Sequence, residues 1–174
     1  MKVEFYKHNI GLKEKKQVLK TLSSTFLSTG PVTQKFEKMF GEFFNNKFAA
    51  TVSSWTMGSL IALKALGIKK GDEIITTPLT FVATINTIIQ NGAKPIVVDV
   101  EGKSGNINAD LIESKITKKT KAIMPVHLYG QMCDMKKIHK IAKKYKLLII
   151  EDCAHCIEGE RAGIRPGDLS DAAI

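Results

Sequence analysis

Short apolar segments that alternate with helix-length amphipathic segments constrain the fold of this chain more than any other feature. Five segments have the composition of strands, at residues 48–54, 72–77, 94–100, 120–128 and 146–152. Segments with helical periodicity separate them, at residues 56–66, 81–91, 109–116 and 135–145. Strands that alternate with helices of about ten residues indicate βαβ units around a parallel sheet. We therefore predict a three-layer α/β fold with a mainly parallel sheet, in which ligands bind at the carboxyl ends of the strands.

Capping residues support several of these boundaries. Gly67 and Gly92 stand where the first two of these helices are expected to end, and Asn108 precedes the third as its N-cap. The last residues, "SDAAI", have the character of the start of a further element. One face of the fourth helix is predicted to carry Met135, Ile138, Ile141, Ala142 and Tyr145.

Two further helices are predicted before the first strand. The first covers Leu12 to Phe26, and the second is predicted to begin with Thr33 as its N-cap. Between them "STGP", residues 28–31, breaks the helical pattern because Gly and Pro together stop a helix and redirect the chain. The second helix carries apolar residues at the spacing of an amphipathic helix: Phe36, Met39, Phe40, Phe43 and Phe44.

The net charge of +9 raises the question of an anionic partner such as nucleic acid. However, the lysines are scattered over several predicted polar helix faces, and the chain has only two arginines, Arg161 and Arg165. The aromatic residues do not interleave with the basic residues, as a surface that stacks on nucleotide bases would require. The charge pattern therefore favours a solvated, lysine-rich surface and predicts no nucleic-acid partner.

Neither a membrane span nor a secretion signal is predicted. The sequence contains no run of about 18 apolar residues, and its first residues, "MKVEFYKHNIGLKEKK", are too highly charged for a signal peptide. We therefore expect a cytoplasmic protein without a membrane partner. In such a reducing compartment the three cysteines stay thiols unless they bind metal or react.

The stretch "IIEDCAHCIEG", residues 149–159, raises the possibility of a metal or redox site. A zinc site needs four ligands, and no second closely spaced pair of ligands accompanies the first pair. We therefore predict no metal site and interpret the two cysteines of this stretch as small apolar residues. The zinc alternative would use Cys153 and Cys156 with two more ligands, such as Cys133 and one of His127, His139 or His155.

Three other features of the sequence carry candidate chemistry. Asp152 follows an apolar strand, where an acid serves either as a functional carboxylate or as a cap for the next turn. "VSSWTMGSL", residues 52–60, places small polar residues at the start of a helix, which favours a bound phosphate but also suits ordinary capping. Phe81 lies at the next strand-to-helix junction, and core packing is the alternative to a role in binding.

Taken in order, these segments resemble the large domain of the DegT/DnrJ/StrS-type sugar aminotransferases, which are pyridoxal-phosphate (PLP) enzymes of the aspartate-aminotransferase fold (PLP fold type I). The resemblance covers almost the whole chain and rests on four segments in sequence order. These segments begin with "STGPVTQKFEKMF", "SSWTMGSLIALKAL", "NINADLIESKI" and "LIIEDCAHCIEG". The resemblance implies an incomplete PLP-binding large domain over residues 1–174, with helices in 1–46 and βα units in 47–174, and without the small C-terminal domain.

The resemblance also implies roles for individual residues. Asp152 would pair with the pyridine nitrogen of PLP and stay ionised beside it. Phe81 would stack on the ring, while Thr56 and Met57 would hold the phosphate through backbone amides and the threonine hydroxyl. His155 would hydrogen-bond the ring oxygen and is counted with Asp152 as catalytic. Gly30 and Pro31 lie in the segment that approaches the sugar substrate.

The Schiff-base lysine of this family is expected in a segment that follows Ile174, so the chain alone is expected to be inactive. The complete protein is expected to be a homodimer that transfers an amino group, usually from glutamate, to a keto group of a nucleotide-linked sugar for polysaccharide biosynthesis. A PLP-dependent ketosugar dehydratase of the same fold is the first alternative. A non-catalytic remnant that keeps the fold as a binding protein is the second.

Overall fold

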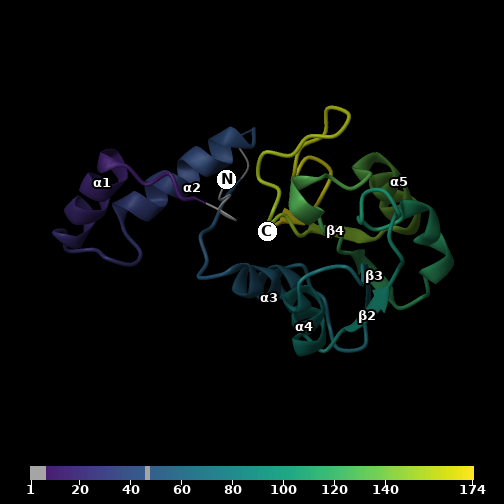
Figure 1. Cartoon of the computed structure of the whole chain (residues 1–174). Coiled ribbons are helices and arrows are strands. Elements are labelled where there is room, and N and C mark those ends of the chain that lie inside the picture. The colour runs from purple at the N-terminus through teal and green to yellow at the C-terminus, as the bar shows by residue number, and fades with distance from the viewer. Residues whose placement is uncertain (1–6, 46–47) are drawn as a thin grey trace. The chain divides into compact units, whose positions relative to one another are not determined.

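The computed structural model describes residues 7–45 and 48–174, which form two compact units divided between Thr51 and Val52. Figure 1 shows the helices of the first unit and the sheet of the second, each of which is described by itself. The predicted boundary between residues 46 and 47 lies outside the described residues. Among the described residues, no helix has the length and hydrophobicity needed to cross a membrane.

The first unit contains the two predicted helices, α1 (Leu12–Leu22) and α2 (Pro31–Phe43). Helix α1 ends four residues before the predicted end at Phe26. The predicted N-cap of α2 is also wrong, because Gly30 takes that position and Pro31 is the first helical residue. The pyrrolidine ring fixes φ near the helical value, so proline suits the first helical position and the helix begins there rather than after Thr33.

The second unit is built around a five-stranded sheet in the order β2-β1-β3-β4-β5, and all of its pairs are parallel. This confirms the predicted α/β class and the parallel sheet. The last strand lies in the "SDAAI" segment, where the sequence predicts the start of a further element. The strands are β1 (Glu73–Thr76), β2 (Lys94–Val97), β3 (Thr120–Ile123), β4 (Leu148–Glu151) and β5 (Ala172–Ala173).

Helices cover both faces of this sheet, which gives the predicted three layers (Figure 1). Successive strand residues belong to opposite cores, as the two-residue period of a strand requires. Ile74 and Ile150 pack with the helices of one face, whereas Ile75 and Ile149 pack with those of the other face. The first face carries α3 (Trp55–Ala65) and α4 (Val82–Gln90). The second face carries α5 (Met135–Tyr145) and two short 3-10 helices, η1 (Ala109–Leu111) and η2 (Glu113–Lys115).

Three predictions about elements after residue 47 need correction. Residues 48–54 form no strand, because no described strand pairs with them and an extended segment without a partner has no ladder of hydrogen bonds. The segment 109–116 forms η1 and η2 instead of an α-helix, although Asn108 does cap η1 by accepting from the Asp110 amide. Tyr145 was predicted to share a face of α5 with four apolar residues, and those four are buried. Tyr145 itself is 38% exposed, because it ends α5 just before Lys146 turns the chain in the left-handed conformation.

Candidate active site

Asp152 directly follows the carboxyl end of β4, and hydrogen bonds fix both its backbone amide and its backbone carbonyl group. Its amide donates to the Pro125 carbonyl oxygen (2.9 Å), and its own carbonyl oxygen accepts from the His127 amide (3.0 Å). These bonds extend the pairing of β3 and β4 by one bridge, between Val126 and Asp152. The residue is 6% exposed, so a rigid backbone presents a nearly buried carboxylate at the ligand-binding edge of the sheet.

Two donors hold the Asp152 carboxylate itself. The Thr84 hydroxyl donates to Oδ2 at 2.9 Å, and the Ala154 amide donates to Oδ1 at 3.3 Å. Each oxygen therefore has one described donor, although a carboxylate oxygen accepts about two. The structure leaves hydrogen-bonding capacity on this group for a further donor.

Burial raises the pKa of Asp152 above its ordinary value, because desolvation penalises the charged form. The hydrogen bonds from Thr84 and Ala154 oppose this effect, as do the nearby rings of His155 and His127. An additional cationic donor at the carboxylate would act in the same direction as these groups and favour the ionised form.

Phe81 is 75% exposed, which excludes the core-packing alternative for its side chain. It is the N-cap residue of α4, directly before the helix that carries Thr84, and its side chain makes no capping bond. Leaving a phenylalanine side chain exposed to water, rather than burying it, costs about 2 kcal/mol. An exposed ring three residues before Thr84, which bonds the Asp152 carboxylate, is therefore available to a planar ligand.

The N-terminus of α3 presents free backbone donors. Ser54 is its N-cap, and the Ser54 hydroxyl accepts from the Met57 amide at 3.2 Å. Among residues 7–45 and 48–174, no acceptor is present for the Thr56 amide. Of the two amides predicted to hold a phosphate, that of Thr56 is thus available, whereas that of Met57 already has a partner.

Hydrogen bonds and close packing connect the start of α3 to Asp152. On α3, one turn after Thr56, Ser59 shares a hydrogen bond with Thr87 of α4 (3.0 Å), and Thr87 donates to the Thr84 carbonyl oxygen. On the other side, a Cβ atom added to Gly58 would lie 2.8 Å from Cγ2 of Ile174. The Ile174 carbonyl oxygen accepts from the Cys153 amide, next to Asp152. The structure thus brings the segments of Thr56, Phe81 and Asp152 to one edge of the sheet.

His155 stands three residues after Asp152 and is exposed. Its ring stacks on that of Tyr129, with the ring centroids 5.9 Å apart and the planes 9° from parallel. Tyr129 is 84% exposed and has a φ of 53°, a left-handed conformation that costs a bulky residue about 1–2 kcal/mol. Sequence reasoning missed Tyr129, because neither its exposure nor its contact with His155 is visible in the local pattern.

Next to the candidate site, His127 and Glu151 form a fully buried pair. The Nε2 atom of His127 lies 2.6 Å from Oε2 of Glu151, and its Nδ1 atom accepts from the Cys133 amide at 3.1 Å. The other oxygen of Glu151 accepts from the Gly167 amide at 2.9 Å. Because Nδ1 is an acceptor, the proton of the ring lies on Nε2 and points to Glu151.

The ligand atoms of His127, Glu151 and Cys153 lie within 4.8 Å of one another, which is close enough to consider a metal ion. However, both ring nitrogens of His127 are already in hydrogen bonds. Burial, followed by the charge of Glu151, raises the pKa of the Cys133 thiol to about 12 and also raises that of Cys153. Zinc binds the thiolate, so a metal ion here would have to displace the protons of these thiols against their raised pKa values.

The two residues predicted to approach the substrate belong to the first unit. Gly30 is buried, and a Cβ atom added there would lie 2.7 Å from Cβ of Phe26. Pro31 is exposed at the start of α2. Glycine is required here by this close approach, and the role of both residues in substrate binding stays a prediction.

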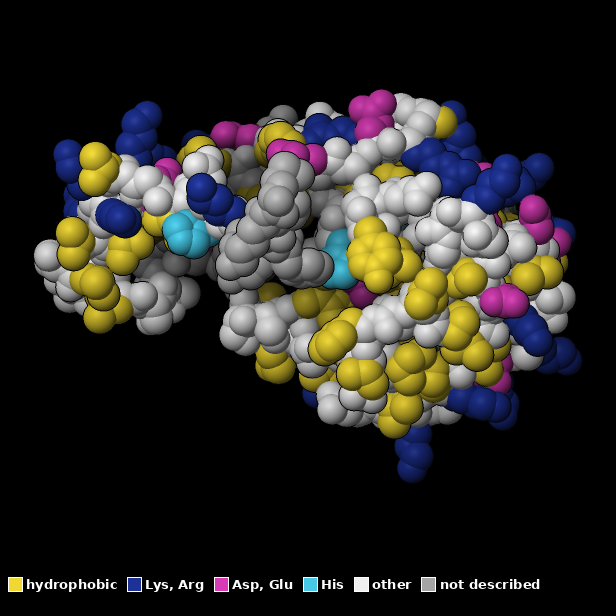
Figure 2. Space-filling model, in the orientation of Figure 1, with side chains coloured by type: hydrophobic (Ala, Val, Ile, Leu, Met, Phe, Trp, Pro, Cys, Tyr) yellow, Lys and Arg dark blue, Asp and Glu magenta, His cyan; other side chains and the backbone are white. Residues whose placement is uncertain are grey.

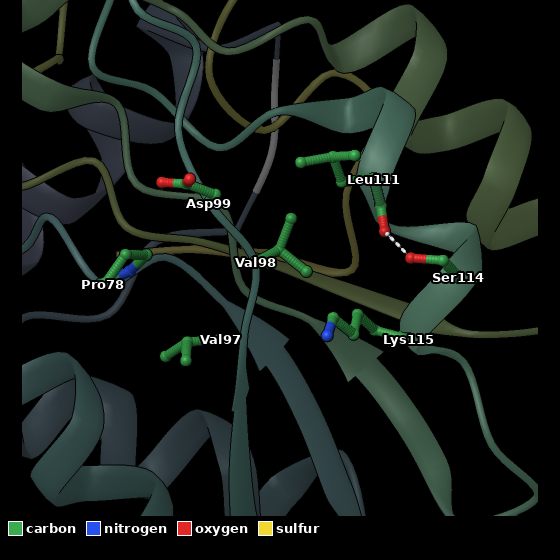
Figure 3. A pocket seen from close by; sticks show the side chains of 7 residues that line it. All are labelled: Pro78, Val97, Val98, Asp99, Leu111, Ser114 and Lys115. Carbon is green, nitrogen blue, oxygen red and sulfur yellow. Dashed lines mark hydrogen bonds between the residues drawn. The ribbon is translucent and has the colours of Figure 1, made fainter.

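An open pocket of about 550 Å³ lies farther along the same edge of the sheet (Figure 3). Its walls come from the loop after β1, the end of β2 and the two 3-10 helices. None of the site residues predicted from the sequence lines it, so this pocket is separate from the candidate active site. The side chains that line the pocket are Pro78, Val97, Val98, Asp99, Leu111, Ser114 and Lys115.

Comparison with known proteins gives the family of the chain. A model described as the DegT/DnrJ/EryC1/StrS aminotransferase family matches residues 8–174. The spore coat polysaccharide biosynthesis protein SpsC of Bacillus subtilis is 44% identical over 94% of this chain, and the GDP-perosamine synthase of Escherichia coli O157:H7 is 43% identical over 97% of it. The chain spans 42% and 47% of the lengths of these two relatives.

Solved structures agree with this result. The putative sugar aminotransferase Spr1654 from Streptococcus pneumoniae, in its PMP form, superposes with a TM-score of 0.92 at 28% identity. The match covers 98% of this chain and 46% of that one. It confirms the aminotransferase-like fold that the sequence predicts, and together with the family match it confirms the resemblance. The chain belongs to the DegT/DnrJ/EryC1/StrS aminotransferase family.

Proposed function

We propose that the full-length protein is a PLP-dependent enzyme that transfers an amino group from glutamate to a keto group of a nucleotide-linked sugar. The observation that carries this proposal is the meeting of three kinds of group at one sheet edge. They are a nearly buried carboxylate with spare acceptor capacity, a free amide at a helix N-terminus and an exposed aromatic ring. PLP offers a matching ring nitrogen, phosphate and planar ring.

The residues of this chain fit that cofactor by their chemistry. Asp152 would accept from the ring nitrogen, and its ionised form would keep that nitrogen protonated. The Thr56 amide and hydroxyl would hold the phosphate, where the N-terminal end of the α3 dipole favours negative charge. Phe81 would fix the plane of the ring, and His155, held by its stack on Tyr129, would contact the ring oxygen. When bound, PLP supplies an electron sink for the substrate carbon that loses its proton.

The substrate and donor are proposed on the basis of the family. One relative is named a GDP-perosamine synthase and another a spore coat polysaccharide biosynthesis protein, which supports a nucleotide-linked sugar in polysaccharide biosynthesis. Glutamate is proposed as the amino donor. We also propose a cytoplasmic location.

We propose that the full-length protein is a homodimer. Figure 2 shows hydrophobic side chains gathered on one face of the second unit. Several are large and well exposed, and a contiguous apolar surface of this kind is typical of an interface. A second copy of the chain is the proposed occupant, and sedimentation of the full-length protein tests it. Exposed apolar residues of the second unit, apart from Phe81, include Leu79, Val82, Ile89, Val97 and Leu111.

The experiment incubates the purified full-length protein with PLP, glutamate and a nucleotide-linked keto sugar, and identifies the products by mass spectrometry. An aminotransferase replaces the keto oxygen with an amine and converts glutamate to 2-oxoglutarate. Asp152→Asn is expected to lower the rate on the order of a hundredfold, because an electrostatic partner of the reacting system is lost. The matched control is Asp110→Asn, which alters an exposed acid that pairs with Lys137 on the surface.

The products separate the alternatives. Loss of water from the sugar without uptake of nitrogen would identify a ketosugar dehydratase and overturn the aminotransferase assignment. Absence of any product, together with no retention of PLP on dialysis, would identify a non-catalytic protein that keeps the fold.

A further inference from the structure

A chain of two threonine hydroxyls leads to the Asp152 carboxylate. The Thr84 hydroxyl lies 2.9 Å from Oδ2 of Asp152, and the Thr80 hydroxyl lies 2.8 Å from that of Thr84. Thr84 is fully buried in the first turn of α4, and Thr80 is half-buried just before Phe81. Neither threonine was among the candidates from the sequence.

The direction of this chain follows from the chemistry of its end group. An ionised carboxylate only accepts hydrogen bonds, so the single proton of the Thr84 hydroxyl must point to Asp152. The Thr84 oxygen is then left as an acceptor, and the Thr80 hydroxyl must donate to it. Both protons therefore point toward the carboxylate, and each bond polarises the next in this buried setting.

The chain also fixes the rotation of the carboxylate. Thr84 holds Oδ2 from α4, whereas the Ala154 amide holds Oδ1 from the turn that follows β4. With the backbone of Asp152 tied to Pro125 and His127, the plane of the carboxylate is set by donors from two separate elements. The bond from Ala154 is the longer of the two, at 3.3 Å, so Thr84 supplies the stronger constraint.

We propose that Thr84, polarised by Thr80, is a positioning residue that aims the Asp152 carboxylate at the ring nitrogen of a bound pyridoxal cofactor. This inference rests on the proposed function, in which the full-length protein uses PLP. Thr84 touches neither cofactor nor substrate in this role and acts through Asp152 alone. Its removal should therefore weaken only the contact that depends on the ring nitrogen.

The test measures binding of pyridoxamine phosphate to the full-length protein by calorimetry, with no turnover involved. The same measurement is made with the 1-deaza analogue, in which carbon replaces the ring nitrogen. Thr84→Val keeps the shape and removes the hydroxyl, and it is expected to weaken pyridoxamine phosphate about tenfold, or ~1.4 kcal/mol. Binding of the deaza analogue should change by less than about twofold, since that ligand has no contact for Asp152 to make.

Three further variants separate positioning from structure. Thr87→Val makes the same change at another fully buried position of α4, where the hydroxyl bonds Ser59 and the Thr84 carbonyl oxygen but not Asp152. It should leave both affinities within about twofold of the wild type. Thr84→Ser restores the hydroxyl and should restore affinity for pyridoxamine phosphate. Thr80→Val alters only the outer member of the chain and should weaken pyridoxamine phosphate about threefold, which tests the proposal at a half-buried site.

Equal losses for both ligands in Thr84→Val, or equal effects of Thr84→Val and Thr87→Val, would overturn the positioning role and leave the proposed function standing. If the wild-type protein binds the two ligands equally or binds neither, the use of the ring nitrogen by Asp152 is wrong. The inference and the cofactor part of the proposed function would then fail together.

Discussion

The buried pair of His127 and Glu151 gives the largest stability effect that we predict. Both side chains are fully buried, and the 2.6 Å contact supplies one of the two described donors to the Glu151 carboxylate. His127→Leu removes that donor while keeping an apolar side chain in the space of the ring. It also leaves the Cys133 amide, now bonded to Nδ1, without an acceptor.

Two effects set the magnitude. Loss of a hydrogen bond to a charged group costs about 1.5–3 kcal/mol, and an unpaired buried amide costs about 1–3 kcal/mol. Their sum, about 2.5–6 kcal/mol, is a large fraction of the total stability of many domains. His127→Leu is therefore expected to remove a large part of the stability of the protein at room temperature.

The assay is urea denaturation of the full-length protein followed by circular dichroism, with the free energy of unfolding from linear extrapolation. His139→Leu is the matched control, since His139 is only half-buried and makes one hydrogen bond, with the Leu169 carbonyl oxygen. It should cost about 1 kcal/mol. The double variant His127→Leu/Glu151→Met removes the unpaired charge and should recover about 1–4 kcal/mol of the loss.

A loss in His127→Leu no larger than that in His139→Leu would refute the reasoning, because the pair would then carry no buried charge that needs a donor. A double variant less stable than His127→Leu would refute it as well. In that case the second substitution would be removing favourable packing instead of an unpaired charge.

Three more predictions concern the candidate site. Phe81→Ala should change the free energy of unfolding by less than about 0.5 kcal/mol but weaken the binding of pyridoxamine phosphate about fivefold in calorimetry. Ile89→Ala, which alters another exposed apolar side chain, should leave this binding unchanged. Burial raises the folded-state pKa of Asp152, so its ionisation opposes folding in the cofactor-free protein. In urea titrations, the stability of Asp152→Asn relative to the wild type should therefore increase as the pH rises through that pKa. Burial raises the pKa of every cysteine, that of Cys133 to about 12, so all three should react with Ellman's reagent at pH 8 slowly in the native protein and rapidly in urea.

Strands β1 to β4 were predictable because each of them carries its own local signal. Ile74 and Ile75, or Ile149 and Ile150, form short apolar pairs that suit a strand buried on both faces. The helices between them end at glycines with positive φ, such as Gly67 at 77° and Gly92 at 82°. Such features act within a few residues of each other, so the sequence alone reveals them.

The wrong prediction at residues 48–54 has the opposite cause. A strand exists only when a partner supplies its hydrogen bonds, and the identity of that partner is not a local property. Phe48 and Val52 of this segment are exposed in the structure, at 106% and 42%. The composition of the segment suits a strand, but composition does not supply a neighbour.

The same distinction explains which site residues were found. Asp152 follows β4, Phe81 directly precedes α4 and Thr56 lies at the start of α3, and the pattern of elements makes such positions visible. Thr84 and Tyr129 act through partners that lie 68 and 26 residues away in sequence, so only the folded chain shows which partners these are.

One local signal for Thr84 was nevertheless present in the sequence. Thr80, Thr84 and Thr87 follow one another at four and three residues, the spacing of a single helix face. Apolar residues would be expected on that face because it is the buried one, and two of the three threonines are fully buried. Buried hydroxyls require partners, so a polar stripe on a helix face turned to the core predicts polar groups opposite it. In this chain those groups are Ser59 and Asp152, and the stripe therefore leads directly to the carboxylate on which the proposed function depends.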